Sequence, residues 1–276
     1  HYIATTAQTA EIAKTKDYTV YAIRWPVFDG VDGEGLLLEP ESDPVAQIIA
    51  LPDADWTPEM LVGLGDGVSP EAQFARRLVE QGCRVVVPAL IDREDEWSGN
   101  PKIGRMTNQT HREFIYRMAF ELGRHIIGYE VQKVLALVDW MCGEENHPPI
   151  GAMGYGEGAL IAFYSAAADT RIDAATVSGY FQSREEVWKE PIYRNVWALL
   201  HEFGDAEVAS LIAPQTLIIE ASQGVEIDGQ PPVRDGRSGA APGRLTTPPL
   251  ESVKSEFERA LTLYKQLGIG QNLILV

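Results

Sequence analysis

Basic residues, cysteines and long apolar runs are all scarce in this sequence. Of its 276 residues, 23 are lysine or arginine and 40 are aspartate or glutamate, which gives a net charge of −17. Such a chain repels nucleic acid and anionic membrane surfaces, so we expect neither as a partner. No apolar run approaches the roughly 20 residues that a membrane-spanning helix needs. Residues 1–10 also lack the basic start and apolar core of a secretory signal.

The two cysteines, Cys83 and Cys142, have no CxxC spacing and no cluster of histidines beside them. This pattern indicates neither a disulfide framework nor a structural zinc site, and we expect no metal or cofactor. Cys83 directly precedes a predicted strand and Cys142 ends a predicted helix, so both are expected to be small core residues. The chain opens on His1 rather than Met, and we expect it to be a segment of a longer protein.

Short apolar runs alternate with helical patterns from about residue 45 onward. The runs are typical of strands covered on both faces, and they occupy residues 46–51, 84–88, 150–154, 172–178, 216–221 and 272–276. Before them, residues 18–25 and 33–38 flank a turn-rich segment and predict an antiparallel hairpin at one sheet edge. The alternation predicts an α/β fold with a mostly parallel sheet between helices. No internal repeat occurs, so we expect one domain over residues 1–276.

Helical spacing of apolar residues predicts helices over residues 70–81, about 110–142 and 253–267. The segment 224–250 is irregular and contains five glycines and five prolines in 27 residues. That is long for a connection in a compact domain, which favours a functional covering loop. Its arginines could then pair with the surplus of carboxylates: Arg234, Arg237 and Arg244. The alternative is a solvated excursion.

The sequence Gly154-Tyr155-Gly156-Glu157-Gly158 joins a predicted strand to a predicted helix. This is the setting of a nucleophile elbow, whose sharp turn needs small residues two before and two after the nucleophile. With the hairpin, the strand order and the stretch 203–214, the chain resembles the α/β-hydrolase superfamily, in particular dienelactone hydrolases and acetyl xylan esterases. The resemblance spans nearly the whole chain. It implies a three-layer α/β-hydrolase-like sandwich related to carboxylic-ester hydrolases.

The chain departs from that family where the chemistry takes place. In the pattern G-x-(Ser/Cys)-x-G the third residue attacks the ester carbonyl, and here it is Gly156. The family's histidine follows the last strand, whereas all five histidines of this chain precede the strand that starts near residue 216: His1, His111, His125, His147 and His201. The family's acid follows that strand, where Glu226 or Asp228 could stand. Glu157 is a candidate for a replacement base or nucleophile. The resemblance therefore implies a degenerate catalytic site.

Backbone amides could still form an anion site at this turn. The N–H of Glu157 and one from the loop after Leu51, at Asp53, would lie where an oxyanion hole forms, at the positive end of the helix. Two interpretations remain: a site that binds an anion or carbonyl without reacting, or a turn retained for packing alone. In a hydrolase the segment 191–203 would cover this position, so Trp197 is a candidate pocket residue. The other interpretation of Trp197, shared with Trp140 and Trp188, is packing.

Two polar groupings allow further interpretations. On one continuous helix His111 and His125 would lie about 21 Å apart, too far to share a metal. An acidic cluster follows the strand 84–88, at the edge where α/β sheets bind ligands: Asp92, Glu94, Asp95 and Glu96. With Trp97 it could bind a sugar, and the alternative is a solvated acidic loop.

Three hypotheses of function remain. The resemblance extends to bacterial esterase-like proteins with two hydrolase units in tandem, which implies a non-catalytic structural or substrate-holding unit beside a second hydrolase domain or chain, with a small ester or carbohydrate as ligand. The second hypothesis is an active carboxylesterase that uses an unconventional residue or a histidine from another segment. Thirdly, Gly154, Gly156 and Ala159 match a dinucleotide fingerprint, although no acidic residue ends the next strand. Family members that act on polysaccharides are often exported, which implies the same location here.

Overall fold

A computed structural model describes residues 10–143 and 146–276 of the chain. Its strands are β1 (Glu11–Lys14), β2 (Tyr18–Phe28), β3 (Val31–Pro40), β4 (Gln47–Leu51), β5 (Arg84–Pro88), β6 (Gly99–Asn100), β7 (Arg105–Met106), β8 (Ile150–Tyr155), β9 (Ala174–Ser178), β10 (Thr216–Glu220) and β11 (Leu273–Leu275). Its α-helices are α1 (Pro58–Val62), α2 (Phe74–Glu80), α3 (His111–Glu121), α4 (Ile126–Met141), α5 (Glu157–Ala168), α6 (Leu199–Glu202), α7 (Asp205–Ile212) and α8 (Leu250–Gln266). Short 3₁₀ turns lie at Pro70–Ala72, Pro101–Ile103, Val187–Lys189, Ile192–Arg194 and Gly270–Asn272.

Nine of these strands form one sheet in the order β1-β2-β3-β5-β4-β8-β9-β10-β11. From β5 to β11 every neighbouring pair is parallel. At the other edge β2 and β3 pair as an antiparallel hairpin, and β3 runs antiparallel to β5. The mostly parallel sheet with its N-terminal hairpin confirms the predicted α/β-hydrolase-like fold.

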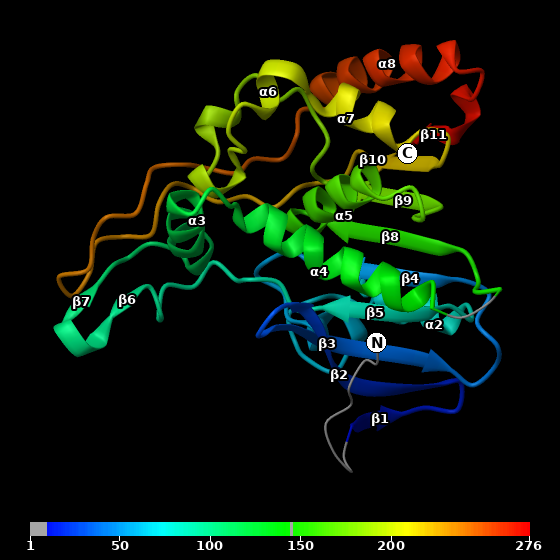
Figure 1. The fold of residues 1–276 in the computed structure, drawn as a ribbon, viewed down its shortest axis with the longest axis horizontal. Helices are drawn as coiled ribbons and strands as arrows, with labels where there is room; N and C mark the ends of the chain where they lie inside the picture. Colours follow the sequence, from blue (N-terminus) through cyan, green and yellow to red (C-terminus); the bar gives the residue numbers. More distant parts are fainter. Residues whose placement is uncertain (1–9, 144–145) are drawn as a thin grey trace.

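Alternate residues of the central strands face two different helical layers. In β5, Val86 belongs to the larger apolar cluster, which includes residues of α3, α4, α5, α7 and α8. Its neighbours Val85 and Val87 belong to a second cluster with α1 and α2. Because successive side chains of a strand point to opposite faces, the molecule has three layers. Figure 1 shows α4 and α5 in front of the sheet. Both cysteines contact these clusters as predicted, Cys142 the larger and Cys83 the smaller.

The helical pattern over residues 110–142 is divided into two helices rather than one. Gly123 adopts a φ of 66°, in the left-handed region that glycine tolerates, and the chain turns there. The ring Nδ1 of His125 then accepts a hydrogen bond of 3.1 Å from the N–H of Ile127 and caps α4. His111 therefore lies on α3 and His125 caps α4, and the separation calculated for one continuous helix does not apply to them. The strand β1 carries no apolar run and was missed by the sequence pattern.

The segment between β10 and α8 lies against the loop that follows β5 (Figure 1, orange). Arg234 forms an ion pair with Asp95 at 2.5 Å, and the guanidinium of Arg237 donates to the backbone oxygen of Asp95 and, at 2.8 Å, to that of Thr107. The N–H of Ala241 donates to the Glu113 carboxylate at 2.9 Å. We call residues 224–249 the strap. Within the described chain, Arg244 forms no ion pair, contrary to the expectation for it.

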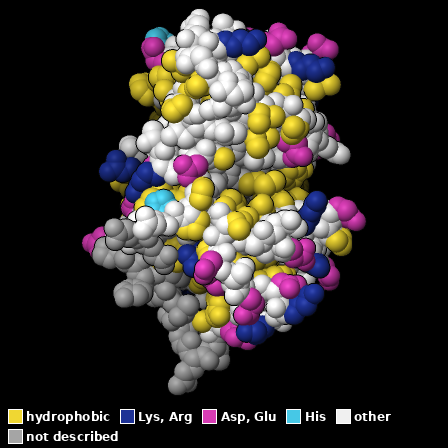
Figure 2. All heavy atoms as spheres, turned by 90° about the vertical axis from the view of Figure 1, so that its right-hand side faces the viewer, with side chains coloured by type: hydrophobic (Ala, Val, Ile, Leu, Met, Phe, Trp, Pro, Cys, Tyr) yellow, Lys and Arg dark blue, Asp and Glu magenta, His cyan; other side chains and the backbone are white. Residues whose placement is uncertain are grey.

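Charged side chains of both signs are scattered over the face drawn in Figure 2, which lies on the side away from the carboxyl ends of β5 and β8. Leaving the grey atoms aside, this face shows no continuous basic surface. No helix within residues 10–143 and 146–276 is long and apolar enough to cross a membrane.

Candidate functional site

The turn between β8 and α5 has the backbone geometry of a nucleophile elbow. Gly156 lies at φ 58° and ψ −115°, between the last residue of the strand and the first of the helix. A Cβ on Gly154 would overlap the carbonyl oxygen of Gly158, and a Cβ on Gly158 would overlap that of Leu51. Both flanking glycines are therefore required by the close approach of strand, helix and neighbouring loop.

A carboxylate of the chain itself occupies the space in front of Gly156. A Cβ built on Gly156 would lie well inside van der Waals distance of Asp53 Oδ2 and 2.8 Å from Val225 Cγ2. A serine side chain at position 156 would need both neighbours to move. The elbow is thus packed for glycine.

The Asp53 carboxylate binds the Glu157 N–H, which we predicted as a donor to an oxyanion. Asp53 Oδ2 accepts a hydrogen bond of 2.9 Å from the N–H of Glu157, at the first turn of α5. Arg93 holds both oxygens, with Nη1 2.6 Å from Oδ1 and Nη2 3.1 Å from Oδ2. Burial would raise the pKa of Asp53, but the Arg93 charge and the helix amide hold it below its usual value. Asp53 is therefore a buried anion bound where an oxyanion would otherwise lie.

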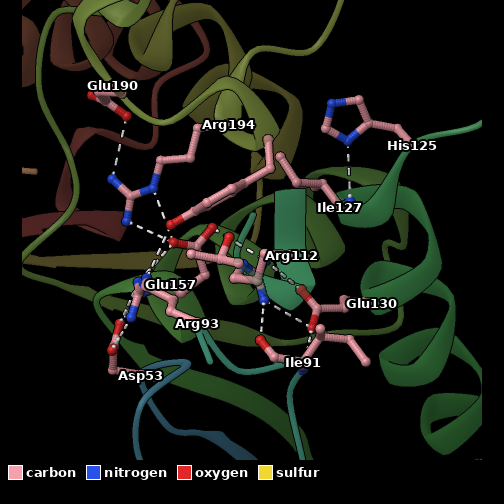
Figure 3. A network of polar contacts seen from close by, with 12 residues as sticks. Asp53, Ile91, Arg93, Arg112, His125, Ile127, Glu130, Glu157, Glu190 and Arg194 are labelled. Carbon is pink, nitrogen blue, oxygen red and sulfur yellow. Dashed lines mark hydrogen bonds and ion pairs between the residues drawn. The ribbon is translucent and has the colours of Figure 1, made fainter. Parts of the chain in front are cut away.

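Three arginines surround the carboxylate of Glu157, which is fully buried. Arg194 Nη2 lies 2.9 Å and Arg93 Nη2 3.1 Å from Oε2, and Arg112 Nη2 lies 3.2 Å from Oε1 (Figure 3). Burial would raise the pKa of Glu157, but the charges of Arg194, Arg112 and Arg93 outweigh it and lower the pKa to about 2. The three guanidinium groups thus hold Glu157 in its ionised form.

Each of these arginines also contacts a second carboxylate. Arg112 pairs with buried Glu130 at 2.7 Å, and Arg194 with Glu190 at 3.3 Å. We call the set Asp53, Arg93, Arg112, Glu130, Glu157 and Arg194 the buried ion network. The network contains three carboxylates and three guanidinium groups, and Asp55 and Glu190 form further ion pairs with it at Arg93 and Arg194. It joins the loops after β4 and β5, helices α3, α4 and α5, and the 3₁₀ turn at Ile192–Arg194.

Of the acidic candidates after β10, neither faces the elbow. The side chain of Val225 is the one that approaches Gly156. Glu226 is exposed and accepts a hydrogen bond of 2.8 Å from the Thr247 hydroxyl, and Asp228 is exposed as well. The structure therefore brings only Asp53 and Glu157 of the predicted residues together.

The interpretation that three tryptophans pack in the core was wrong for two of them. Trp197 is 80% exposed and Trp188 is 72% exposed, so neither packs in the core. Trp197 also contributes to none of the cavities described for the molecule. Trp140 is half-buried and contacts the larger apolar cluster. An apolar side chain in an irregular segment gives no periodicity from which its burial can be predicted.

The described histidines are engaged away from the elbow. In His111, Nδ1 lies 2.6 Å from Asp92 Oδ1, and Nε2 accepts a hydrogen bond of 2.9 Å from the N–H of Trp97. The ring of His125 caps α4, and exposed His201 contacts the adjacent Glu202. Within residues 10–143 and 146–276, no histidine forms a hydrogen bond or ion pair with the buried ion network, and no group of three potential metal ligands occurs. His1 lies outside the described residues.

The acidic cluster after β5 does not act as one unit. Asp95 is buried and pairs with Arg234 of the strap, so the solvated-loop interpretation fails for it. Glu94 and Glu96 are exposed, and Trp97 is 77% exposed. Beside this loop lies a cavity of about 300 Å³, lined among others by Asp55, Arg93 and Tyr193 and by strap residues. Through Arg93 this cavity borders the buried ion network.

The elbow, the strand order and the N-terminal hairpin can be compared with known families. The model of the dienelactone hydrolase family matches residues 36–196, from β3 to beyond α5. The chain belongs to this family. The match includes the elbow and all six residues of the buried ion network.

Solved structures share the fold of this family member at low sequence identity. A provisionally assigned acetyl xylan esterase from Bacteroides fragilis aligns with a TM-score of 0.68 and 16% identity, over 95% of this chain and 67% of its own. A methylesterase gives a TM-score of 0.59 and 15% identity, over 97% and 51% of the two chains. A glucuronoyl esterase from Solibacter usitatus gives 0.54 and 11%, over 91% and 70%. The chain thus spans about half to two thirds of these proteins. No curated protein sequence matches it.

Proposed function

We propose that this chain is a non-catalytic hydrolase unit, which serves as a structural or ligand-holding part of a larger esterase. The observation that carries the proposal is the position of the Asp53 carboxylate, bound to the Glu157 N–H and packed against Gly156. Ester hydrolysis on this fold needs a nucleophile at the elbow, a base to activate it and free donors for the oxyanion. Here glycine stands at the elbow and an internal anion holds the donor.

The partner and ligand follow from the same proposal. The solved structures described above extend well beyond the length of this chain, which supports a second hydrolase domain or chain as its partner. The cavity of about 300 Å³ beside Arg93 supports a small ester or carbohydrate as ligand, since its lining combines apolar groups with the charged Arg93 and Asp55. The active partner would supply the nucleophile and the histidine.

An active esterase based on Glu157 is the alternative, and its geometry is unfavourable. A carboxylate with a pKa of about 2 is a weak base, and all its oxygens are held by guanidinium groups. Using it as a nucleophile would also require breaking ion pairs inside the protein.

Dinucleotide binding meets a similar obstacle. A phosphate at the start of α5 would have to displace Asp53 from the Glu157 N–H. The purified chain is accordingly expected to show no absorbance or fluorescence of a bound nicotinamide or flavin.

Hydrolysis of 4-nitrophenyl acetate and of an acetylated xylooligosaccharide by the purified chain tests the proposal. We expect rates equal to the buffer background for the chain and for Glu157→Gln. Glu258→Gln, which changes an exposed carboxylate on α8, serves as the matched control for contaminating esterases. Turnover at least tenfold above background that is retained in Glu258→Gln and lost in Glu157→Gln would overturn the proposal in favour of the alternative.

A further inference from the structure

A cavity of about 460 Å³ lies outside the elbow, between the end of the β2–β3 hairpin and helices α3 and α4. This volume is within the range of roughly 300–1,000 Å³ of small-molecule sites. Its lining is apolar except for two charged side chains of α4, Glu130 and Lys133. Among the lining residues, Glu130 belongs to the buried ion network.

The apolar walls of this cavity come from three parts of the chain. Phe28 and Val31 of the hairpin are 42% and 51% exposed and stand at its entrance, while Ile126 is fully buried at its floor. The rings of Phe28 and Tyr129 meet edge to face with centroids 5.6 Å apart. These contacts connect hairpin and helix, so the apolar walls are held in place before any ligand arrives.

The two charged groups of the lining differ in their partners. Glu130 is fully used, because it accepts hydrogen bonds from Arg112 at 2.7 Å and from the N–H of Ile91 at 2.9 Å. The ammonium of Lys133 has a backbone partner, the oxygen of Ala89 at 3.2 Å. In the described part of the chain it forms no ion pair, and burial holds its pKa below the usual value. Lys133 is thus a mostly buried cation that forms no ion pair with a described residue, although the charges of Glu130 and Glu34 oppose the effect of burial on its pKa.

We propose that this cavity binds a medium-chain alkyl monocarboxylate. The carboxylate would pair with Lys133 Nζ, and the alkyl chain would lie between Phe28, Val31 and the floor of the cavity. A cationic ligand would meet the ammonium without a free counter-charge, since Glu130 is neutralised by Arg112. A neutral ligand would leave the ammonium without an ionic partner. Charge complementarity therefore selects an anion, and the apolar walls select its tail.

Calorimetric titration of the chain with octanoate, below its micelle concentration, tests this proposal. We expect saturable binding, an affinity about fourfold higher for each methylene between hexanoate and octanoate, and weaker binding of octanol. Lys133→Met keeps the apolar stem and should weaken octanoate binding at least tenfold while leaving octanol binding unchanged. Lys254→Met, which changes an exposed lysine of α8, should bind octanoate like the unmodified chain.

A second pair of variants tests the tail independently of the charge. Val31→Asp places a carboxylate at the exposed entrance and should weaken octanoate binding at least tenfold, whereas Val233→Asp on the strap should not change it. Thermal melting of each variant verifies that it is folded. The proposal is overturned if octanoate does not bind at millimolar concentration, or if Lys133→Met and Val31→Asp both bind it as the unmodified chain does.

Discussion

At the scale of single residues, the most distinctive feature is a set of buried charges beside Gly156. The Glu157 carboxylate is removed from water completely, which is costly unless cations accompany it. Arg93, Arg112 and Arg194 supply these cations from three different segments. Removing one member of such a set lowers the free energy of unfolding by more than an exposed ion pair contributes. The reason is that the remaining charges stay buried without a partner.

Glu157→Gln is therefore expected to lower the free energy of unfolding by about 3–5 kcal/mol at pH 7. The folded pKa of about 2 lies below the ordinary value of 4.5, so Glu157 contributes stability above pH 4.5 that is lost as the pH falls toward 2. That part amounts to about 3 kcal/mol. Urea unfolding between pH 2 and 7 measures both effects. The account fails if the variant shows the same acid-induced loss as Glu258→Gln.

Gly156→Ser tests whether the Asp53 carboxylate blocks the elbow. The left-handed φ of Gly156 strains a serine by about 1–3 kcal/mol, and overlap with Asp53 adds to this. In an Asp53→Ala background the overlap is absent. Gly156→Ser lowers the free energy of unfolding in both backgrounds, and we expect this loss to be smaller by at least about 1 kcal/mol in the Asp53→Ala background. A double-mutant cycle of urea unfolding measures the difference. Simple additivity of the two substitutions would contradict the packing described here.

At the scale of elements, the strap is fixed to the loop after β5 by side chains rather than by strand pairing. Its principal anchor is Asp95, which pairs with Arg234 and whose backbone oxygen accepts from Arg237. The strap also lines the cavity of about 300 Å³, so its position determines access to that cavity.

Asp95→Asn should loosen the strap without unfolding the sheet. Arg234 then loses its counter-charge, and we expect trypsin to cleave within residues 224–249 several times faster, with an unchanged melting temperature. Asp228→Asn alters an exposed carboxylate of the same segment and provides the control. Equal cleavage rates for the two variants would show that the ion pair does not hold the strap.

The elements of the fold could be predicted from the sequence because their signals are local. The apolar runs indicate the buried strands, and the glycines at 154, 156 and 158 indicate the elbow. The division of the 110–142 helix was missed, although Gly123 is a residue that ends helices. Strand β1, exposed at the sheet edge, carries no apolar pattern to read.

The candidate site could be predicted only in part, for a related reason. Glu157 belongs to the elbow motif, and Asp53 lies in the loop after β4 where the resemblance implies an oxyanion amide, so the sequence indicates both positions but not the role of the Asp53 carboxylate. Their arginine partners lie 64, 45 and 37 residues from Glu157 in sequence, and only the folded chain brings them together. One signal was available: Glu130 interrupts the apolar face of its helix between Ile127 and Val134, where a carboxylate needs a buried partner.

At the scale of the whole molecule, the fold of the dienelactone hydrolase family carries the buried ion network next to its elbow. The nine-stranded sheet and three layers do not depend on a nucleophile, since the elbow is held by glycine contacts and by the Asp53 bond to α5. The fold alone therefore does not determine whether this chain catalyses a reaction.

Covalent labelling by a fluorophosphonate tests the central claim most directly. The chain is incubated with an excess of the reagent at pH 7.5, and its intact mass is measured beside that of an active serine esterase treated in parallel. We predict that the mass of the chain stays unchanged while the esterase is labelled completely. Stoichiometric labelling of the chain at one residue beside the elbow, abolished by prior unfolding, would contradict the account.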